Sequence, residues 1–246
     1  MDNFDKRLLS ISEAAKYLDI TEATLRRWHN KGAFMASFLS PGGHRYYSLA
    51  DLEQKTKGLF RLAQEWAGAE KPFLPESGFY CSTSDVFKSR LERMARELDA
   101  HPALKETSSL ISSAAGEIGN NSFDHNLGNW PDVPGAFFAY DLGKRVIVLA
   151  DRGVGVLATL QRAKPSLATD EDALRTAFTE YITGRAPEHR GNGLKYVKEA
   201  LTGANADLTF QSGNAILEIQ KGKSEFTIKR SEDSIRGSLV LIKFQI

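Results

Sequence analysis

The chain has 246 residues, of which 41% are hydrophobic and 26% charged, and this balance excludes a wholly disordered protein. The formal net charge is +1, so the charge of the whole chain favours no class of partner. The single cysteine excludes an intrachain disulfide and metal sites built on several thiolates. No apolar run approaches the roughly 18 residues of a membrane span, and the N-terminal "MDNFDKRLLS" lacks the pattern of a signal peptide. We therefore expect a cytoplasmic protein without a membrane partner.

The first part of the chain contains two short helical patterns joined by a tight turn. The first is "ISEAAKYLD", for which Ser10 or Ser12 can serve as the N-cap. The second is "ITEATLRRWHNKG", which Thr21 can cap and Gly32 can end. The next stretch, "SPGGHRYYS", predicts a turn followed by a short aromatic strand. A third helix is expected over about 49–68, and "AEKPFLPESG" after it is the best linker candidate.

A second region begins near residue 84. Four helical patterns occur in it, over 84–99, 104–126, 170–183 and 193–202. The runs "AFFAY" and "RVIVLAD", joined by "DLGK", predict a β-hairpin, and four strand-like runs close the chain: "ADLTFQ", "AILEIQ", "EFTIKR" and "SLVLIKFQI". Helices on one side of a mostly antiparallel sheet predict a two-layer α/β sandwich. We therefore expect domains at 1–70 and 84–246, joined by a linker at 71–83.

A local basic patch lies in the N-terminal region. No acidic residue occurs between Ala23 and Ala50, although this stretch holds several arginines and histidines. Arginines near the start of the second helix of a helix-turn-helix can reach base edges or phosphates, and an aromatic strand beside the duplex can donate to phosphates. The residues expected to contact duplex DNA are Thr21, Arg26, Arg27, His44, Arg45, Tyr46 and Tyr47.

Two segments of this region, "LRRWHNKG" and "GGHRYYSLADL", carry a family resemblance. The stretch that contains them, about residues 8–57, resembles the DNA-binding domain of the MerR family and the related excisionase-like winged helix-turn-helix domains. The resemblance implies that the helix pair enters the major groove and that the wing grips the backbone. MerR regulators then continue into a long dimerising helix, whereas the third helix here is expected to stop near Gly68.

The segment "GEIGNNSFDHN" is expected to be helical, although two glycines and two adjacent asparagines make it a poor helix former. Glu117, Asn121 and Asp124 follow one another at i, i+4 and i+7, so all three project from one stripe. Such a row at the edge of an apolar face predicts a ligand or a metal. Gly116 and Gly119 are expected to allow close packing of this helix on the sheet.

Two glycine-containing motifs follow this helix: "DRGVG" after the predicted hairpin and "RGNGL" at the start of another helix. The three motifs, in this order and with a hairpin between the first two, resemble the GHKL ATPase superfamily, which includes the ATP-binding domains of gyrase, Hsp90, histidine kinases and MutL. The resemblance covers about residues 104–246. The predicted fold class is therefore α+β, with an N-terminal all-α winged helix-turn-helix followed by a two-layer sandwich of the Bergerat type.

The GHKL resemblance implies ATP and Mg²⁺ as cofactors and assigns roles to the motif residues. Asn121 would be the Mg²⁺ ligand through its amide oxygen, and Glu117 the general base that activates a water. Asp151 would accept the adenine amino hydrogen, and Asp124 would support the pocket. The remaining nucleotide-binding residues would be Gly153, Gly155, Arg190, Gly191, Gly193, Leu194 and Ser238. The stretch between Leu160 and Arg190 would form a lid, in which Arg185 or Arg190 would touch the γ-phosphate.

These assignments lead to one main functional hypothesis and two alternatives. The main hypothesis is a transcriptional regulator whose DNA binding or homodimer formation depends on bound nucleotide. The first alternative is a protein kinase of the histidine-kinase or anti-sigma (serine kinase) type that phosphorylates a partner. The second is a DNA-maintenance or phage-defence ATPase. Whether the chain is a Mg²⁺-dependent ATPase, a protein kinase or a nucleotide sensor is left open by the sequence, as is any protein partner.

Overall fold

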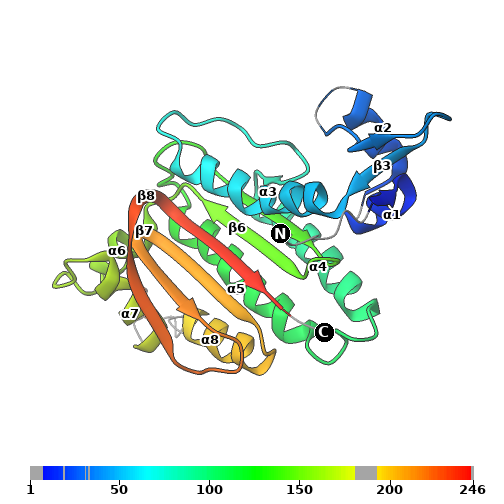
Figure 1. Ribbon diagram of the computed structural model, residues 1–246. Coiled ribbons are helices and arrows are strands. Elements are labelled where there is room, and N and C mark those ends of the chain that lie inside the picture. Colours follow the sequence, from blue (N-terminus) through cyan, green and yellow to red (C-terminus); the bar gives the residue numbers. More distant parts are fainter. Residues whose placement is uncertain (1–7, 19, 31, 33, 181–192, 245–246) are drawn as a thin grey trace, which may run out of the picture. The chain divides into compact units, whose positions relative to one another are not determined.

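The computed structural model describes residues 8–18, 20–30, 32, 34–180 and 193–244, apart from the side chains of 50 and 53–57 (Figure 1). The chain forms two compact units. The N-terminal unit comprises Met1–Arg61 and Asp141–Arg145, and the C-terminal unit comprises Leu62–Tyr140 and Val146–Ile246. The division between the units falls inside one helix, and the domain limits expected from the sequence stay a prediction.

The N-terminal unit combines helices with a small sheet. Its elements are β1 (Leu8–Ser10), α1 (Ile11–Tyr17), α2 (Glu22–Asn30), β2 (Phe38–Leu39), β3 (Arg45–Ser48) and the first part of α3 (Leu49–Gly68). The strands form an antiparallel sheet in the order β1-β3-β2. The prediction of an all-α unit is therefore wrong. Strands of two to four residues carry little local signal, and they pair only when the chain has folded.

Local hydrogen bonds fix the start and the end of the helix pair. Ser10 Oγ accepts from the N–H of Glu13, and the Glu13 carboxylate accepts from the N–H of Ser10 at 2.8 Å, which is a capping box. Ser10, and not Ser12, is thus the N-cap of α1. Gly32 follows α2 with a φ of +70°, a conformation that glycine adopts without strain.

The core of the N-terminal unit lies between the helix pair and the small sheet. Its fully buried or nearly buried side chains are Leu9, Ala14, Ala15, Leu25, Tyr47 and Leu52. They come from β1, α1, α2, β3 and α3. Each element therefore contributes one face to a single apolar cluster, which holds the short elements in place.

The C-terminal unit is built on a five-stranded sheet with the order β4-β5-β6-β8-β7. Its elements are β4 (Tyr80–Cys81), α4 (Ser84–Ala100), α5 (Ser108–Asn126), β5 (Ala136–Asp141), β6 (Val146–Asp151), α6 (Gly155–Gln161), α7 (Asp170–Thr179), α8 (Gly193–Gly203), β7 (Asp207–Ile219) and β8 (Phe226–Lys243). The pairings β4–β5, β6–β8 and β7–β8 are antiparallel, which confirms the expected antiparallel sheet. The four closing runs of the sequence form two long strands, β7 and β8, whose register shifts near Gly213.

Neighbouring aromatic residues of β5 show that helices cover both faces of this sheet. The ring of Phe138 lies 5.2 Å from that of Phe87 on α4, whereas the ring of Phe137 lies 6.4 Å from that of Trp66 on α3. Successive strand residues point to opposite faces, so α4 and the end of α3 lie on different sides (Figure 1). The predicted two-layer sandwich had helices on one side of the sheet only and did not include the end of α3.

The glycines of α5 serve contacts between helices. A Cβ at Gly119 would lie 2.0 Å from Cζ of Phe87, and one at Gly116 would lie 3.1 Å from Cδ2 of Leu91. Both of these neighbours belong to α4, so the expectation that these glycines face the sheet is wrong. The physical reason expected for them, close approach of a second element to a position without a side chain, nevertheless applies to their packing on α4. None of the described helices is both long and apolar enough to cross a membrane.

Candidate functional site

The exposed face of α2 carries two arginines predicted to reach DNA. Arg26 and Arg27 are both exposed, and Arg26 Nη2 lies 2.7 Å from Glu22 Oε2 one turn earlier. A surface ion pair of this kind contributes at most about 1 kcal/mol, so a phosphate can replace the carboxylate at small cost. Thr21 is exposed at the start of α2, and its Oγ1 accepts from the N–H of Thr24 at 3.1 Å, as expected of the N-cap.

The strand β3 and the turn before it carry the other predicted DNA contacts. His44 is exposed in the turn between β2 and β3. Arg45 is half-buried, and its Nη2 donates to Asn30 Oδ1 at 3.1 Å, which ties this hairpin to the end of α2. Tyr46 is also half-buried, with its ring 6.0 Å from that of Phe38. In this hairpin the side chain of His44 is thus exposed, and those of Arg45 and Tyr46 are partly exposed.

Tyr47 is not available to DNA, and its predicted phosphate contact is wrong. Its side chain is completely buried and stacks on Phe34 at 5.4 Å between ring centroids. Burial raises the pKa of the Tyr47 hydroxyl, an effect that the charge of Arg45 partly offsets. Alternation along β3 explains the difference from Tyr46, because successive strand residues face opposite sides.

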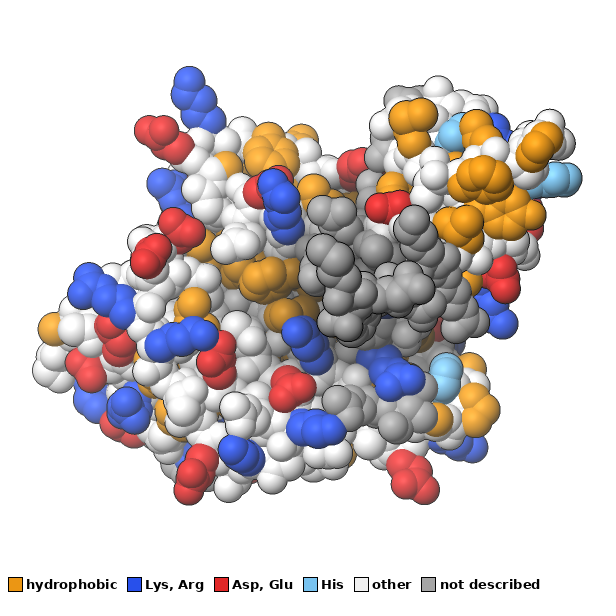
Figure 2. Space-filling model, viewed as in Figure 1, with side chains coloured by type: hydrophobic (Ala, Val, Ile, Leu, Met, Phe, Trp, Pro, Cys, Tyr) orange, Lys and Arg blue, Asp and Glu red, His pale blue; other side chains and the backbone are white. Residues whose placement is uncertain are grey.

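Hydrophobic side chains also gather on the visible face of the N-terminal unit, at the upper right of Figure 2. Among the described residues of this unit, the large exposed hydrophobic ones are Leu8, Met35, Phe38 and Leu39. Two of them belong to β2, which is an edge strand of the small sheet. Sequence reasoning that searched for charged DNA contacts missed this surface.

In the C-terminal unit, Asp151 ends β6 as a buried carboxylate. Ser122 Oγ of α5 donates to its Oδ2 at 2.9 Å, and the N–H of Gly153 donates to its Oδ1 at 2.8 Å. Ser238 pairs with Asp151 in the β6–β8 register and donates to it through the hydroxyl and the backbone. Burial raises the pKa of Asp151, and these hydrogen bonds oppose the rise. The sequence predicted Asp151 and Ser238 as neighbours of one pocket, but it missed Ser122.

The turn after Asp151 is shaped by Asn126, which sequence reasoning also missed. Asn126 is buried; its Oδ1 accepts from the N–H of Val154 at 2.8 Å, and its Nδ2 donates to the carbonyl of Ser122 at 2.7 Å. A Cβ at Gly153 would lie 2.1 Å from the same Nδ2. Gly153 is therefore required for close approach of the turn to α5.

Two glycines with positive φ continue this arrangement. Gly155 has a φ of +81°, and Gly237 on β8 has a φ of +74°. A Cβ at Gly237 would lie 2.3 Å from the carbonyl oxygen of Asp151 and 2.7 Å from the nitrogen of Gly153. Ser212 Oγ donates to the carbonyl of Gly237 at 2.8 Å. Gly237 is thus packed against the backbone of the turn, which leaves no room for a side chain there, and the positive φ of Gly155 disfavours one at that position.

The start of α8 lies against the polar stripe of α5. Glu117 and Asn121 are half-buried, and a Cβ at Gly193 would lie 2.9 Å from Glu117 Oε2 and 3.3 Å from Asn121 Nδ2. Leu194 is half-buried in the first turn of α8, whereas Asp124 is exposed. The structure therefore brings together two members of the predicted stripe with a glycine of the third motif. Arg185, Arg190 and Gly191 lie outside the described residues.

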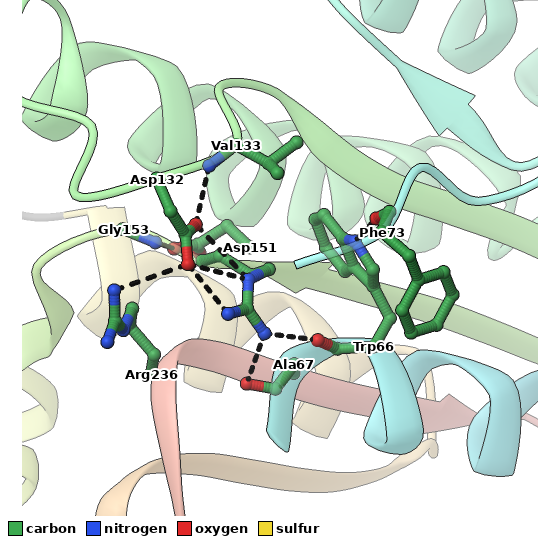
Figure 3. Close-up of polar contacts among 9 residues, drawn as sticks. Trp66, Ala67, Phe73, Asp132, Val133, Asp151, Gly153 and Arg236 are labelled. Carbon is green, nitrogen blue, oxygen red and sulfur yellow. Dashed lines mark hydrogen bonds and ion pairs between the residues drawn. The ribbon is translucent and has the colours of Figure 1, made fainter. Parts of the chain in front are cut away.

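Arg152 is a buried cation that the sequence did not single out. It is fully buried, and its guanidinium forms an ion pair with Asp132, with Nη2 2.6 Å from Oδ2 (Figure 3). Arg236 Nη1 lies 3.2 Å from the same Oδ2. Burial alone would raise the pKa of Asp132, but hydrogen bonds and charge from Arg152, with Val133 and Arg236, outweigh it and lower the pKa.

A cavity of about 420 Å³ opens beside this cluster. Its wall is formed by the end of α3, the turn into α6, and parts of β7 and β8; the lining residues include Gly68, Glu70, Gly155, Asp170 and Arg236. Glu117, Asn121 and Asp151 are not among them. The cavity is therefore a separate feature from the polar stripe of α5.

Comparison with known proteins assigns a class to the N-terminal unit. Residues 8–54 match the family model described as a helix-turn-helix domain. The match spans α1, α2, the three short strands and the start of α3. With the exposed arginines on α2, it indicates that this unit binds DNA. A search of curated proteins with the chain finds no match.

Proposed function

We propose that this chain is a DNA-binding transcriptional regulator whose C-terminal unit binds Mg·ATP in a Bergerat-type site of the GHKL kind. Within this proposal the DNA-binding domain is a winged helix-turn-helix of the MerR and excisionase-like type. The β2–β3 hairpin after α2 supports the winged type, because a wing is a hairpin that follows the recognition helix.

The approach of Gly193 to Glu117 and Asn121 is the observation that carries the nucleotide-binding proposal. These residues come from separate motifs, and the missing side chain of Gly193 lets the start of α8 approach both polar groups closely. Backbone N–H groups at the start of α8 can bind phosphate oxygens. The Asn121 amide oxygen would hold Mg²⁺, and Glu117 would orient and deprotonate a water. Bound Mg²⁺ would supply the positive charge that neutralises the phosphates.

The same helix connects this stripe to Asp151. Ser122, next to Asn121 on α5, donates to the Asp151 carboxylate at 2.9 Å. The proposed adenine-reading residue and the proposed phosphate end of the site are thus anchored on neighbouring residues of one helix. Among the described residues no group of three or more His, Cys, Asp or Glu side chains could hold a metal ion. A Mg²⁺ ion bound by one asparagine and by phosphate oxygens needs no such group.

Calorimetric titration of the full chain with Mg·ATP tests the site. Asn121→Ala is expected to weaken Mg²⁺-dependent binding more than 100-fold, whereas Glu117→Ala is expected to retain binding and lose turnover. Asn129→Ala, which changes an exposed asparagine just beyond α5, is the matched control and should bind as the wild type does. Wild-type affinity in Asn121→Ala would refute the proposal.

A gel-shift series with and without Mg·ATP tests the regulatory part. The proposal expects the apparent DNA affinity, or the stoichiometry of the complex, to change with nucleotide, because binding energy that differs between two states shifts their populations. Identical DNA binding in both conditions would count against regulation. Incubation with labelled ATP separates the enzymatic outcomes, since label on protein would favour the kinase alternative and free phosphate the ATPase.

A further inference from the structure

Two consecutive residues of the motif "DRGVG" point to different partners. The Asp151 carboxylate accepts from Ser122 on α5, whereas the fully buried Arg152 guanidinium donates to the carbonyl of Trp66 in the last turn of α3. Figure 3 draws Trp66 and Ala67 of α3 together with Asp132 and Asp151. The helix α5 also carries the stripe proposed to bind Mg·ATP. The turn 151–155 therefore lies between the proposed nucleotide site and the end of α3.

Arg152 caps the C-terminal end of α3. Its Nη1 donates to the carbonyl oxygens of Trp66 and, at 3.3 Å, of Ala67. The last carbonyl groups of a helix have no partner within the helix, and a cation there also interacts favourably with the helix dipole. Trp66 Nε1 donates in turn to the carbonyl of Phe73 at 2.8 Å, so the cap extends to the segment after α3.

The ion pair with Asp132 keeps Arg152 in this place. Asp132 accepts from Nε and Nη2 of the guanidinium at 3.1 and 2.6 Å, while Nη1 remains directed at α3. Only the planar fork of arginine can hold a carboxylate on one side and two carbonyls on another. A buried cation without its partner would be strongly unfavourable. Arg152 therefore cannot move away from Asp132 and the end of α3 unless the turn 151–155 also changes.

The cavity of about 420 Å³ borders both the end of α3 and the turn that bears Arg152. Ala67 and Gly68 from the end of α3 lie in its wall, as do Val154 and Gly155 from the turn. Packed interiors resist small shifts, whereas groups beside open space have room to move. The end of α3 and the turn therefore each border open space on one side.

We propose that Arg152 is a positioning residue that links occupancy of the nucleotide site to the order of the last turn of α3. The inference rests on the proposed function. Nucleotide bound against Asp151 and Gly153 selects one conformation of the turn, and this conformation keeps Arg152 on the Trp66 and Ala67 carbonyls. Linkage is reciprocal, so weakening the cap must also weaken nucleotide binding. The same helix α3 begins at Leu49, within the N-terminal unit.

The test uses the full chain and combines calorimetry with amide hydrogen exchange. Arg152→Lys keeps the charge but has a single ammonium group, which cannot serve Asp132 and both carbonyls. It is expected to bind Mg·ATP roughly tenfold more weakly. Arg236→Lys is the matched control, because Arg236 pairs with the same Asp132 oxygen at the half-exposed rim, and it should bind within twofold of the wild type. Thermal unfolding of each variant checks that it is folded.

Hydrogen exchange in the wild type tests the link without any variant. Adding a saturating non-hydrolysable Mg·ATP analogue should slow exchange of peptides covering 62–68 at least threefold, and Arg152→Lys at saturation should lose this effect. Binding without any change of exchange in α3 overturns the inference and leaves the proposed function standing. Wild-type affinity together with wild-type slowing in folded Arg152→Lys also overturns it. No binding by the wild type overturns the proposed function and this inference with it.

Discussion

Substitution of Gly153 by alanine perturbs the contact between the motif turn and α5. The added Cβ would lie 2.1 Å from Nδ2, 2.3 Å from Cγ and 2.3 Å from Oδ1 of Asn126, closer than any real contact. Asn126 is buried and holds both the N–H of Val154 and the carbonyl of Ser122. Because the obstacle is a side chain amide fixed by two hydrogen bonds, either the turn or Asn126 must move.

The cost can be estimated from these contacts. Forcing extra volume into a packed site costs roughly 1–3 kcal/mol, and each buried polar group left unpaired costs about 1–3 kcal/mol. Since the structure relaxes in part, we expect Gly153→Ala to lower the free energy of unfolding by about 2–5 kcal/mol. This is a large share of the roughly 5–15 kcal/mol typical of folded proteins. Nucleotide binding should be lost as well, because the N–H of Gly153 also holds Asp151.

Urea unfolding followed by circular dichroism measures the effect. Gly58→Ala is the control, since an added Cβ there has no heavy atom within 4 Å; it should raise the free energy of unfolding by about 1 kcal/mol, the helix preference of alanine over glycine. The double variant with Asn126→Ala should lose about 1–3 kcal/mol less than the sum of the two single variants. A loss below about 0.5 kcal/mol in Gly153→Ala, or strict additivity, would refute the reasoning.

Two further predictions concern DNA binding and pH. Arg27→Ala should weaken DNA binding roughly tenfold at low salt and lower by about one the slope of the logarithm of DNA affinity against the logarithm of salt concentration. Arg175→Ala, which changes an exposed arginine on α7, should alter neither quantity. Fluorescence anisotropy titrations from low to high salt measure both, and equal behaviour of the two variants would contradict the prediction. Because burial raises the pKa of Asp151 above its ordinary value of 3.8, the folded state holds that proton when the unfolded state has lost it. Its contribution to stability should therefore be present below pH 3.8 and be lost as pH rises toward the folded-state pKa. The difference between the urea unfolding midpoints of the wild type and of Asp151→Asn should accordingly fall as the pH rises. A constant or rising difference would show that Asp151 is not buried as described.

Local features of the fold could be predicted because they depend on residues a few positions apart. The helix pair needs only its caps, and the Ser10 and Thr21 hydrogen bonds both span three residues. The runs that form β5 and β6 are also visible in the sequence, because their apolar composition is a local property. The helix-turn-helix was predictable for the same reason, and the family match at residues 8–54 confirms it. The nucleotide site was harder to predict, because the sequence shows the order of its three motifs, whereas their approach to one another depends on the fold.

The tertiary structure alone decided which side chains of these elements are accessible and what they hold. Tyr46 and Tyr47 are adjacent and chemically alike, yet the second is buried, because the core of the N-terminal unit closes on its side of β3. Arg152 reaches a carbonyl that is 86 residues away in the chain, and no short-range pattern indicates such a partner. The physical reason is the range of the interactions: caps and periodicity act between sequence neighbours, whereas burial and the pairing of buried charge depend on every element that closes around a side chain.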